Sequence, residues 1–330
     1  MKILVVGATG AIGRPLISAL VASRRDVIGI TTTEHGVQTL HDRGAEAFVA
    51  DALDRDAIET VFRKVRPDAV VDELTSLPKE YTPAEMKAAA PRDRELRLVG
   101  GRNVQDSAIS AGARRYIVQS TGFFYAPGAG LATEAEPLAW EASAGIAGSV
   151  RTYGQIEDRV LRAPELEGLA LRYGFFYGPG TYHDPATGSI SRQVREGQYP
   201  IIGSGEGVFS FVHVEDAAAA TVAALEAEPG VYNVVDDDPS NMSIWLPAFA
   251  RFLGAPDPRV ISEAEALRTE GADSIYYATR LRGASNSRAK RKLGFVARRS
   301  EWLHNTQVAH GARLSNISDS GGTRGSRASR

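Results

Sequence analysis

Three glycines near the start of the sequence lie between an apolar run and a segment with helical spacing. Residues 3–6 are all apolar, Gly7, Gly10 and Gly13 follow, and residues 12–22 repeat apolar side chains at helical intervals. In a strand–turn–helix unit, the first glycine allows the tight turn, the second lets the backbone approach a pyrophosphate, and the third lets the helix pack closely on the sheet. The helix N-terminus then offers free N–H groups to phosphates. The motif therefore predicts a dinucleotide-binding site.

The apolar runs that follow this motif alternate with helix-like segments. The expected strands are residues 3–6, 27–30, 47–50, 69–71, 116–119 and 169–173, and helical spacing is clearest over 12–22, 57–65 and 97–111. Strands that are apolar throughout are buried on both faces, and strands separated by helices must pair in parallel. The pattern predicts an α/β fold, a Rossmann doubly wound parallel sheet with a smaller mixed C-terminal region.

Regular alternation weakens after Tyr173, where loops rich in glycine and proline begin. We therefore expect a Rossmann domain over 1–172 and a mainly substrate-binding region over 173–314, some segments of which return to the sheet. Further helices are expected over 216–227, 242–253 and 261–268, and a strand over 231–235. Residues 315–330 are mostly Ser, Gly and Arg and have little to bury, so a disordered tail is expected there.

Composition excludes several classes of protein. There is no cysteine, so neither a disulfide framework nor a thiolate metal site can form, and the six histidines show no metal-ligand spacing. A net charge of -2 favours no nucleic-acid or membrane partner. No apolar stretch is long enough for a transmembrane helix and no signal peptide is visible, so a cytoplasmic protein is expected.

Several motifs together resemble the short-chain dehydrogenase/reductase superfamily, and within it the extended or atypical branch named for NAD-dependent epimerases and dehydratases. The resemblance covers roughly residues 1–300. The motifs are Gly7 to Gly13 in G-x-x-G-x-x-G spacing, Asp51-Ala52-Leu53, Ser120-Thr121 before Tyr125, Tyr153-Gly154, Leu171-Arg172-Tyr173, Tyr177-Gly178-Pro179-Gly180 and the run 211–216. The resemblance implies a nicotinamide dinucleotide cofactor and, as is common in the superfamily, a homodimer.

The resemblance also implies which residues hold the cofactor. Asp51, Ala52 and Leu53 would lie near the adenine, and Leu74 and Thr75 would line the path to the nicotinamide ribose. The full expected set is Gly7, Thr9, Gly10, Ala11, Ile12, Gly13, Arg14, Thr32, Asp51, Ala52, Leu53, Leu74, Thr75, Ser120, Tyr153 and Tyr173.

The choice between NAD and NADP depends on the end of the second strand. A carboxylate there would bind the ribose 2′-hydroxyl of NAD, but residues 31–33 are threonines and no acid occurs before Glu34. Arg14 directly follows the last glycine and can reach a 2′-phosphate. We therefore favour NADP, with NAD as the alternative.

The resemblance places a hydroxyl residue after the fifth strand and a tyrosine followed four residues later by lysine. Thr121 and Tyr153 occupy the first two positions, but the third is Glu157. The lysine would lower the tyrosine pKa, whereas an ionised Glu157, on the same helix face, would raise it. No lysine occurs between Lys87 and Lys290. The catalytic candidates are accordingly Tyr153, Thr121 and Glu157.

Three interpretations of this centre stay open. In the first, Tyr153 acts as a neutral proton donor in a reductase that works only toward the alcohol. In the second, the proton comes from water or another group, and in the third the chain binds the cofactor without turnover, as a sensor.

The residues expected on the substrate side are aromatic. Phe123 and Phe124 follow Thr121, and Phe175, Phe176 and Tyr177 follow the sixth strand. Ligands of such folds bind beyond the carboxyl ends of the strands, so we expect a small, rather apolar substrate whose carbonyl is reduced. A sugar-nucleotide epimerase or dehydratase, with Arg192, Arg195 or Arg280 holding the diphosphate, remains the alternative enzyme.

Overall fold

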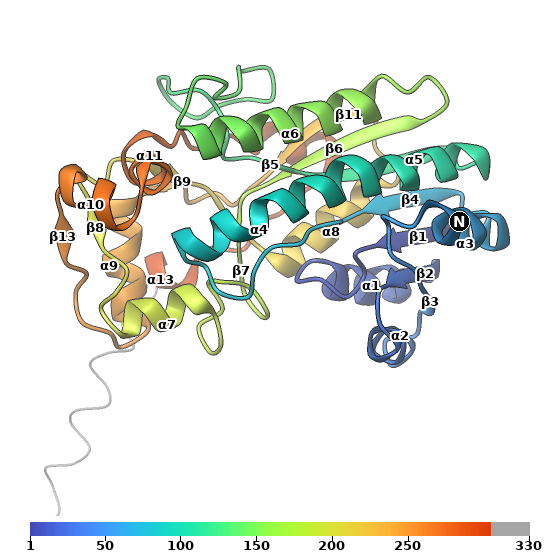
Figure 1. The fold of residues 1–330 in the computed structure, drawn as a ribbon, viewed down its shortest axis with the longest axis horizontal. Coiled ribbons are helices and arrows are strands. Elements are labelled where there is room, and N and C mark those ends of the chain that lie inside the picture. The colour runs from blue at the N-terminus through green and yellow to red at the C-terminus, as the bar shows by residue number, and fades with distance from the viewer. Residues whose placement is uncertain (305–330) are drawn as a thin grey trace, which may run out of the picture.

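A seven-stranded, entirely parallel sheet forms the centre of the molecule (Figure 1). The computed structural model describes residues 1–304. The strands are arranged in the order β11-β6-β5-β4-β1-β2-β3, so the order reverses between β1 and β4. The predicted doubly wound sheet is thus confirmed. Its strands are β1 (Lys2–Val6), β2 (Asp26–Thr31), β3 (Glu46–Val49), β4 (Ala69–Asp72), β5 (Arg115–Thr121), β6 (Glu167–Tyr173) and β11 (Gly230–Val234).

Helices cover both faces of this sheet. On one face, α1 (Gly13–Ala22) and α8 (Val214–Ala224) pack on Ile3, Val5 and Ile117. On the other face, α3 (Arg55–Val65), α5 (Gly101–Ser110) and α6 (Ala144–Leu161) pack on Leu4 and Val6. Because successive strand residues point to opposite faces, each apolar strand serves two cores.

The helix predicted over 97–111 is the last part of a longer helical stretch. It begins with α4 (Pro83–Glu95), passes through a π-helical turn, η1 (Leu96–Gly100), and continues as α5. Thr82 caps α4 by accepting a hydrogen bond from Glu85 N, and Pro83 occupies the first turn, where its missing N–H costs nothing. A π-helical turn alters the angular position of side chains on either side of it, and Arg97 lies within this one.

A second group of elements lies together at one end of the molecule (left in Figure 1). Its core is aromatic, with Trp245 fully buried against Phe209, Phe211 and Phe249. Its elements, with the short strands and helices that connect it to the sheet, are β7 (Phe175–Tyr177), α7 (Ser189–Arg195), β8 (Ile201–Ile202), β9 (Val208–Phe209), β10 (Phe211–His213), β12 (Ser240–Asn241), α9 (Met242–Phe252), β13 (Val260–Ile261), α10 (Glu263–Thr269), α11 (Ala272–Arg280) and α13 (Glu301–His304).

Three elements after residue 173 return to the sheet. β11 pairs with β6, and α8 packs against α1, while α12 (Ser287–Leu293) adds Ala289 to the same core. The remaining helix, α2 (Glu34–His41), follows β2 and is capped by Thr33. The tail expected over 315–330 lies outside the described residues. Within residues 1–304, no helix has the length and apolarity that a bilayer crossing requires.

Candidate functional site

The glycine loop between β1 and α1 is tight enough that side chains at two of its glycines would collide with backbone. Gly7 has a φ of +76°, and a Cβ there would lie 2.5 Å from the carbonyl oxygen of Glu73; a Cβ on Gly13 would lie 2.3 Å from the carbonyl oxygen of Gly7. A Cβ on Gly10 would approach only that same oxygen, at 3.2 Å. No side chain caps the N-terminus of α1. The main-chain N–H groups at the start of α1 are therefore not taken by a capping side chain, and such groups can bind a pyrophosphate.

The residues expected around the adenosine end surround this loop. Thr9 Oγ1 lies 3.5 Å from Thr31 Oγ1, while Thr32 is exposed. Arg14 Nε donates to the carbonyl oxygen of Gly10 at 3.4 Å. Arg14 Nη2 lies close to Gly180, because a Cβ built on that glycine would be 3.0 Å from it. The guanidinium therefore lies between the glycine loop and the loop that follows β7.

Asp51, Ala52 and Leu53 form a turn after β3. Asp51 Oδ1 accepts a hydrogen bond from Leu53 N at 2.9 Å, and its other oxygen lies 3.5 Å from Arg92. Ala52 is buried, and its carbonyl oxygen accepts from Asn103 Nδ2 at 2.9 Å. The turn thus contacts α4 through Arg92 and α5 through Asn103.

Asp93, which lies on α4, organises the segment after β4. Its Oδ1 accepts from Thr75 Oγ1 at 3.1 Å and from Ser76 N at 2.6 Å, and its Oδ2 accepts from Arg97 Nε at 2.8 Å. Leu74 is buried, and its N–H donates to Asp72 Oδ1 at 3.1 Å. Two of the expected cofactor residues, Leu74 and Thr75, are therefore fixed by carboxylates, one of which also holds a buried cation.

Thr121 ends β5 with a hydroxyl that is enclosed and, among residues 1–304, has no hydrogen-bond partner. Tyr153 lies on α6, its ring centroid 6.0 Å from that of Phe124, and the guanidinium of Arg97 lies 4.9 Å from the centre of the Tyr153 ring. Burial raises the pKa of Tyr153, Arg97 opposes this effect, and Asp93 adds to it. Tyr153 is therefore held as a neutral phenol near neutral pH.

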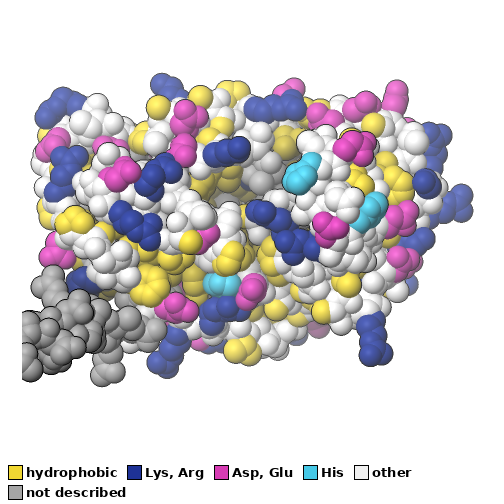
Figure 2. All heavy atoms as spheres, turned by 90° about the horizontal axis from the view of Figure 1, so that it is seen from below, with side chains coloured by type: hydrophobic (Ala, Val, Ile, Leu, Met, Phe, Trp, Pro, Cys, Tyr) yellow, Lys and Arg dark blue, Asp and Glu magenta, His cyan; other side chains and the backbone are white. Residues whose placement is uncertain are grey.

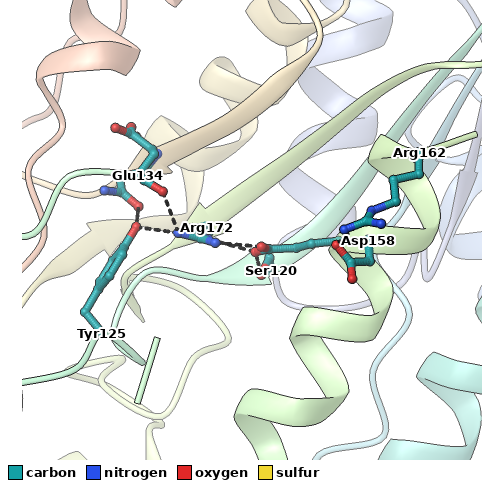
Figure 3. Close-up of polar contacts among 8 residues, drawn as sticks. Ser120, Tyr125, Glu134, Asp158, Arg162 and Arg172 are labelled. Carbon is teal, nitrogen blue, oxygen red and sulfur yellow. Dashed lines mark hydrogen bonds and ion pairs between the residues drawn. The ribbon is translucent and has the colours of Figure 1, made fainter. Parts of the chain in front are cut away.

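Glu157 belongs to a buried network between α6 and the strands β5 and β6, and Figure 3 labels its partners Ser120 and Arg172. Its Oε1 accepts from Ser120 Oγ at 2.6 Å and from Arg172 Nε at 2.8 Å, and its Oε2 accepts from Arg172 Nη2 at 2.6 Å. Arg172 Nη1 also donates to Tyr125 Oη at 2.8 Å, and Tyr125 donates to Asn233. Glu157 is not among the groups that shift the pKa of Tyr153. Of the two expected site residues, Glu157 is thus bonded both to Ser120 and to Arg172.

Tyr173 is also buried, on the opposite face of the sheet. Its hydroxyl donates to Glu73 Oε1 at 3.1 Å and lies 2.6 Å from Thr221 Oγ1. The second oxygen of Glu73 is enclosed and has no partner within residues 1–304, and burial raises the pKa of Glu73 to about 8. Burial therefore favours the protonated form of the Glu73 carboxyl, which contacts Tyr173, while the Glu73 backbone blocks the Cβ position of Gly7.

The structure brings together three of the five aromatic residues expected on the substrate side. Phe123 and Phe175 stack with centroids 4.1 Å apart, and Phe124 packs against both Phe123 and Tyr153. Tyr277 of α11 completes this group, 6.0 Å from Phe175. These rings therefore connect the ends of β5 and β6 to α11, which belongs to the second group of elements.

The other two expected aromatic residues pack elsewhere. The ring centroid of Phe176 lies 5.2 Å from that of Tyr173. The ring centroid of Tyr177 lies 4.7 Å from that of Trp302 and 5.0 Å from that of His213. His213 Nδ1 accepts from Glu215 N at 3.2 Å, so the His213 side chain caps the start of α8.

Sequence reasoning missed three residues of this region. Arg97, Asp93 and Tyr277 come from segments 56 to 124 residues away from Tyr153, and no motif marks them. The exposed charges give no further clue, because Figure 2 shows basic and acidic side chains interspersed over the face that it presents.

Comparisons with known proteins agree with this geometry. A family model described as the NAD dependent epimerase/dehydratase family matches residues 3–234. A Streptomyces protein named 3-diazoavenalumate denitrifying reductase is 40% identical over 309 residues, which are 92% of this chain and 98% of that protein. Protein YeeZ of Escherichia coli (strain K12) is 26% identical over 268 residues, 78% of this chain and 86% of YeeZ.

Solved structures share the fold. The UDP-glucose 4-epimerase of Thermus thermophilus, in complex with NAD, superposes with a TM-score of 0.70 at 24% identity, covering 92% of this chain and 96% of the epimerase. The dTDP-glucose 4,6-dehydratase DesIV of Streptomyces venezuelae, with NAD bound, has a TM-score of 0.71 at 20% identity, covering 91% and 93%.

Proposed function

Because this chain belongs to the NAD-dependent epimerase/dehydratase family, we propose that it is a nicotinamide-dependent reductase of a small, planar aromatic metabolite. The observation that carries this proposal is the stack of Phe123 on Phe175, which lies with Phe124 against Tyr153 at the ends of β5 and β6. Aromatic rings favour an offset or edge contact with another planar ring. The similar Streptomyces protein is named as a reductase, which supports net reduction over epimerisation.

The cofactor would be held by the loop from Gly7 to Gly13 and by the segments around Asp51 and Thr75. We favour NADPH because Arg14 lies beside this loop and no carboxylate follows β2 before Glu34. When bound, the reduced nicotinamide supplies a hydride, and the protein supplies position and electrostatics.

For a carbonyl substrate, Tyr153 and Thr121 perform the polar part of the reaction. The carbonyl carbon gains the hydride, and its oxygen takes the proton of the Tyr153 hydroxyl, which water then replaces. The unpartnered Thr121 hydroxyl hydrogen-bonds the same oxygen. A neutral tyrosine suffices in this direction, because the step starts from the protonated phenol. Glu157 acts by positioning α6 and does not touch the substrate.

A second candidate substrate is a diazo-substituted aromatic compound. The name of the Streptomyces reductase describes a diazo substrate that loses nitrogen. In such a step the ring carbon gains a hydride while its bond to nitrogen breaks, and dinitrogen leaves with the bonding electrons. No proton is needed, which suits a site with no lysine four residues after Tyr153.

Oxidation of NADPH in the presence of aromatic ketones, quinones and arenediazonium compounds tests the proposal. We expect consumption of NADPH with at least one of these classes. If the carbonyl class is correct, Tyr153→Phe slows turnover by about 100-fold or more; if the diazo class is correct, the same variant retains its rate. Cofactor binding without any oxidation would overturn the proposal in favour of a sensor, and UDP-sugar conversion without net oxidation would favour an epimerase.

A further inference from the structure

Arg97 is a buried cation that is held by a hydrogen bond to Asp93. Only 4% of the residue is exposed, and its Nε donates to Asp93 Oδ2 at 2.8 Å. Asp93 is itself held by Thr75 and Ser76 through its other oxygen. A planar guanidinium anchored through one N–H in this way has little rotational freedom, so its remaining N–H groups keep a defined direction.

The guanidinium of Arg97 lies over the ring of Tyr153. Its central carbon lies 4.9 Å from the centre of the Tyr153 ring, within the range of a cation–π contact. Within the described residues, Nε makes the one hydrogen bond that Arg97 donates. A cavity of about 10 Å³ beside it, lined also by Asp72, Leu74 and Ile156, offers room for about one water molecule.

Other basic residues near α6 do not take this place. Arg159 donates to Gln105 Oε1 at 2.8 Å and to the carbonyl oxygen of Leu98 at 3.2 Å, and Arg151 is exposed. No lysine occurs between Lys87 and Lys290. Within residues 1–304, the charged and titratable groups that act on Tyr153 are Arg97 and Asp93, with the phenol of Tyr277 nearby on α11.

We propose that Arg97 is a positioning residue for Tyr153 and supplies the positive charge that a lysine on the next turn of α6 would otherwise supply. A cation over the ring stabilises the anionic phenol more than the neutral one, so it assists loss of the Tyr153 proton. Burial lowers the pKa of Arg97, but Tyr153 and Asp93 raise it by more, so this cation persists at all working pH values. The inference rests on the proposed reductase function with Tyr153 in the site.

The test is the ionisation of Tyr153 itself, measured without substrate. Alkaline absorbance titration of each protein, minus the same titration of its Tyr153→Phe counterpart, isolates the Tyr153 phenolate. We expect Arg97→Met to shift this titration upward by about one pH unit or more, and Arg97→Lys to restore most of the difference. Asp93→Asn should shift it downward, because it removes the anion that opposes Arg97. Arg94→Met, an exposed arginine on the same helix, should leave it unchanged.

Kinetics give the second readout. With a carbonyl substrate, kcat of Arg97→Met should fall by about tenfold or more while the KM for NADPH changes little. Circular dichroism establishes that each variant is folded, and Asp93→Asn, whose expected shift has the opposite sign, keeps the test decisive if Arg97→Met does not fold. Unchanged Tyr153 titration in both Arg97→Met and Asp93→Asn would overturn the inference. If the Tyr153 titration shifts in these variants but the wild-type protein shows no reductase activity, the effect of Arg97 on Tyr153 stands and the proposed reductase function is rejected.

Discussion

Glu157 Oε2 lies 2.6 Å from Arg172 Nη2, so the carboxylate four residues after Tyr153 is committed to a buried ion pair. Both side chains are almost completely buried, and Ser120 and Tyr125 complete the network. A buried pair is costly to break because the remaining charge loses its partner. The residue that replaces the expected lysine therefore serves the scaffold of α6.

Introducing that lysine should harm the protein. In Glu157→Lys, an ammonium would face the Arg172 guanidinium without a counter-charge, and we expect a loss of about 3–5 kcal/mol in the free energy of unfolding. Urea unfolding followed by circular dichroism measures this loss. The control is Asp158→Lys on the exposed neighbouring position, which should change stability by less than about 1 kcal/mol. Wild-type stability in Glu157→Lys, with faster turnover, would contradict the structural role.

Adding a single methyl group to the glycine loop should weaken cofactor binding. A Cβ on Gly13 would lie 2.3 Å from the carbonyl oxygen of Gly7, so Gly13→Ala must displace the loop, and we expect NADPH affinity to fall by about tenfold or more. Calorimetric titration provides the measurement. Gly148→Ala, in α6 where a Cβ would meet nothing within 4 Å beyond the neighbouring helix backbone, should bind normally and gain up to about 1 kcal/mol of stability. Equal binding by both variants would remove the loop from the site.

Arg14 predicts the cofactor preference. If its guanidinium contacts a 2′-phosphate, Arg14→Met should raise the Kd for NADPH by about tenfold, a loss of about 1.4 kcal/mol. NADH carries no such phosphate, so its Kd serves as the internal control and should change by less than about twofold. Parallel weakening of both cofactors would show that Arg14 does not distinguish them.

Glu73 predicts a pH dependence of stability. Its pKa is about 8 in the folded protein, because of burial, against 4.5 for an ordinary glutamate. Between these values the folded chain retains a proton that the unfolded chain has released, so the free energy of unfolding falls as pH rises through this window. The slope reaches at most about 1.4 kcal/mol per pH unit, and no further loss occurs above the folded pKa.

Glu73→Gln cannot titrate and should lack this component. Urea unfolding of both proteins at several pH values between about 5 and about 9 compares them, with the variant gaining stability over wild type toward the alkaline end. If the difference between the two proteins stays constant over this range, Glu73 is ionised in the folded state.

The strands of the sheet could be predicted because each is a short apolar run and each helix between them is bounded by turns. α4 was missed because none of its residues is buried, so its sequence carries no apolar stripe. The NAD-dependent epimerase/dehydratase resemblance was confirmed, because its motifs are local and lie at strand ends.

The environment of Tyr153 could not be predicted in the same way. Helical spacing predicted that Glu157 shares a face of α6 with Tyr153, but it did not reveal that Arg172, fifteen residues later on β6, would bind Glu157. Arg97 lies within a π-helical turn, whose altered register is invisible in a pattern of 3.6 residues per turn. The partner of Glu157 and the position of Arg97 both depend on contacts between separate elements, which a local sequence pattern does not contain.

The Arg172 network joins α6, β5, β6 and, through Tyr125 and Asn233, β11 (Figure 3). It therefore sets the rotation of α6 about its own axis, and Tyr153 lies one turn before the point of attachment. If Tyr153 is the proton donor that we propose, a substitution that only loosened this attachment would slow turnover with every reacting group still present. Replacing Glu157 by lysine would also require a change at Arg172, because two buried cations would otherwise face each other. A variant with only one of these two changes would lack the ion pair that attaches α6 to β6.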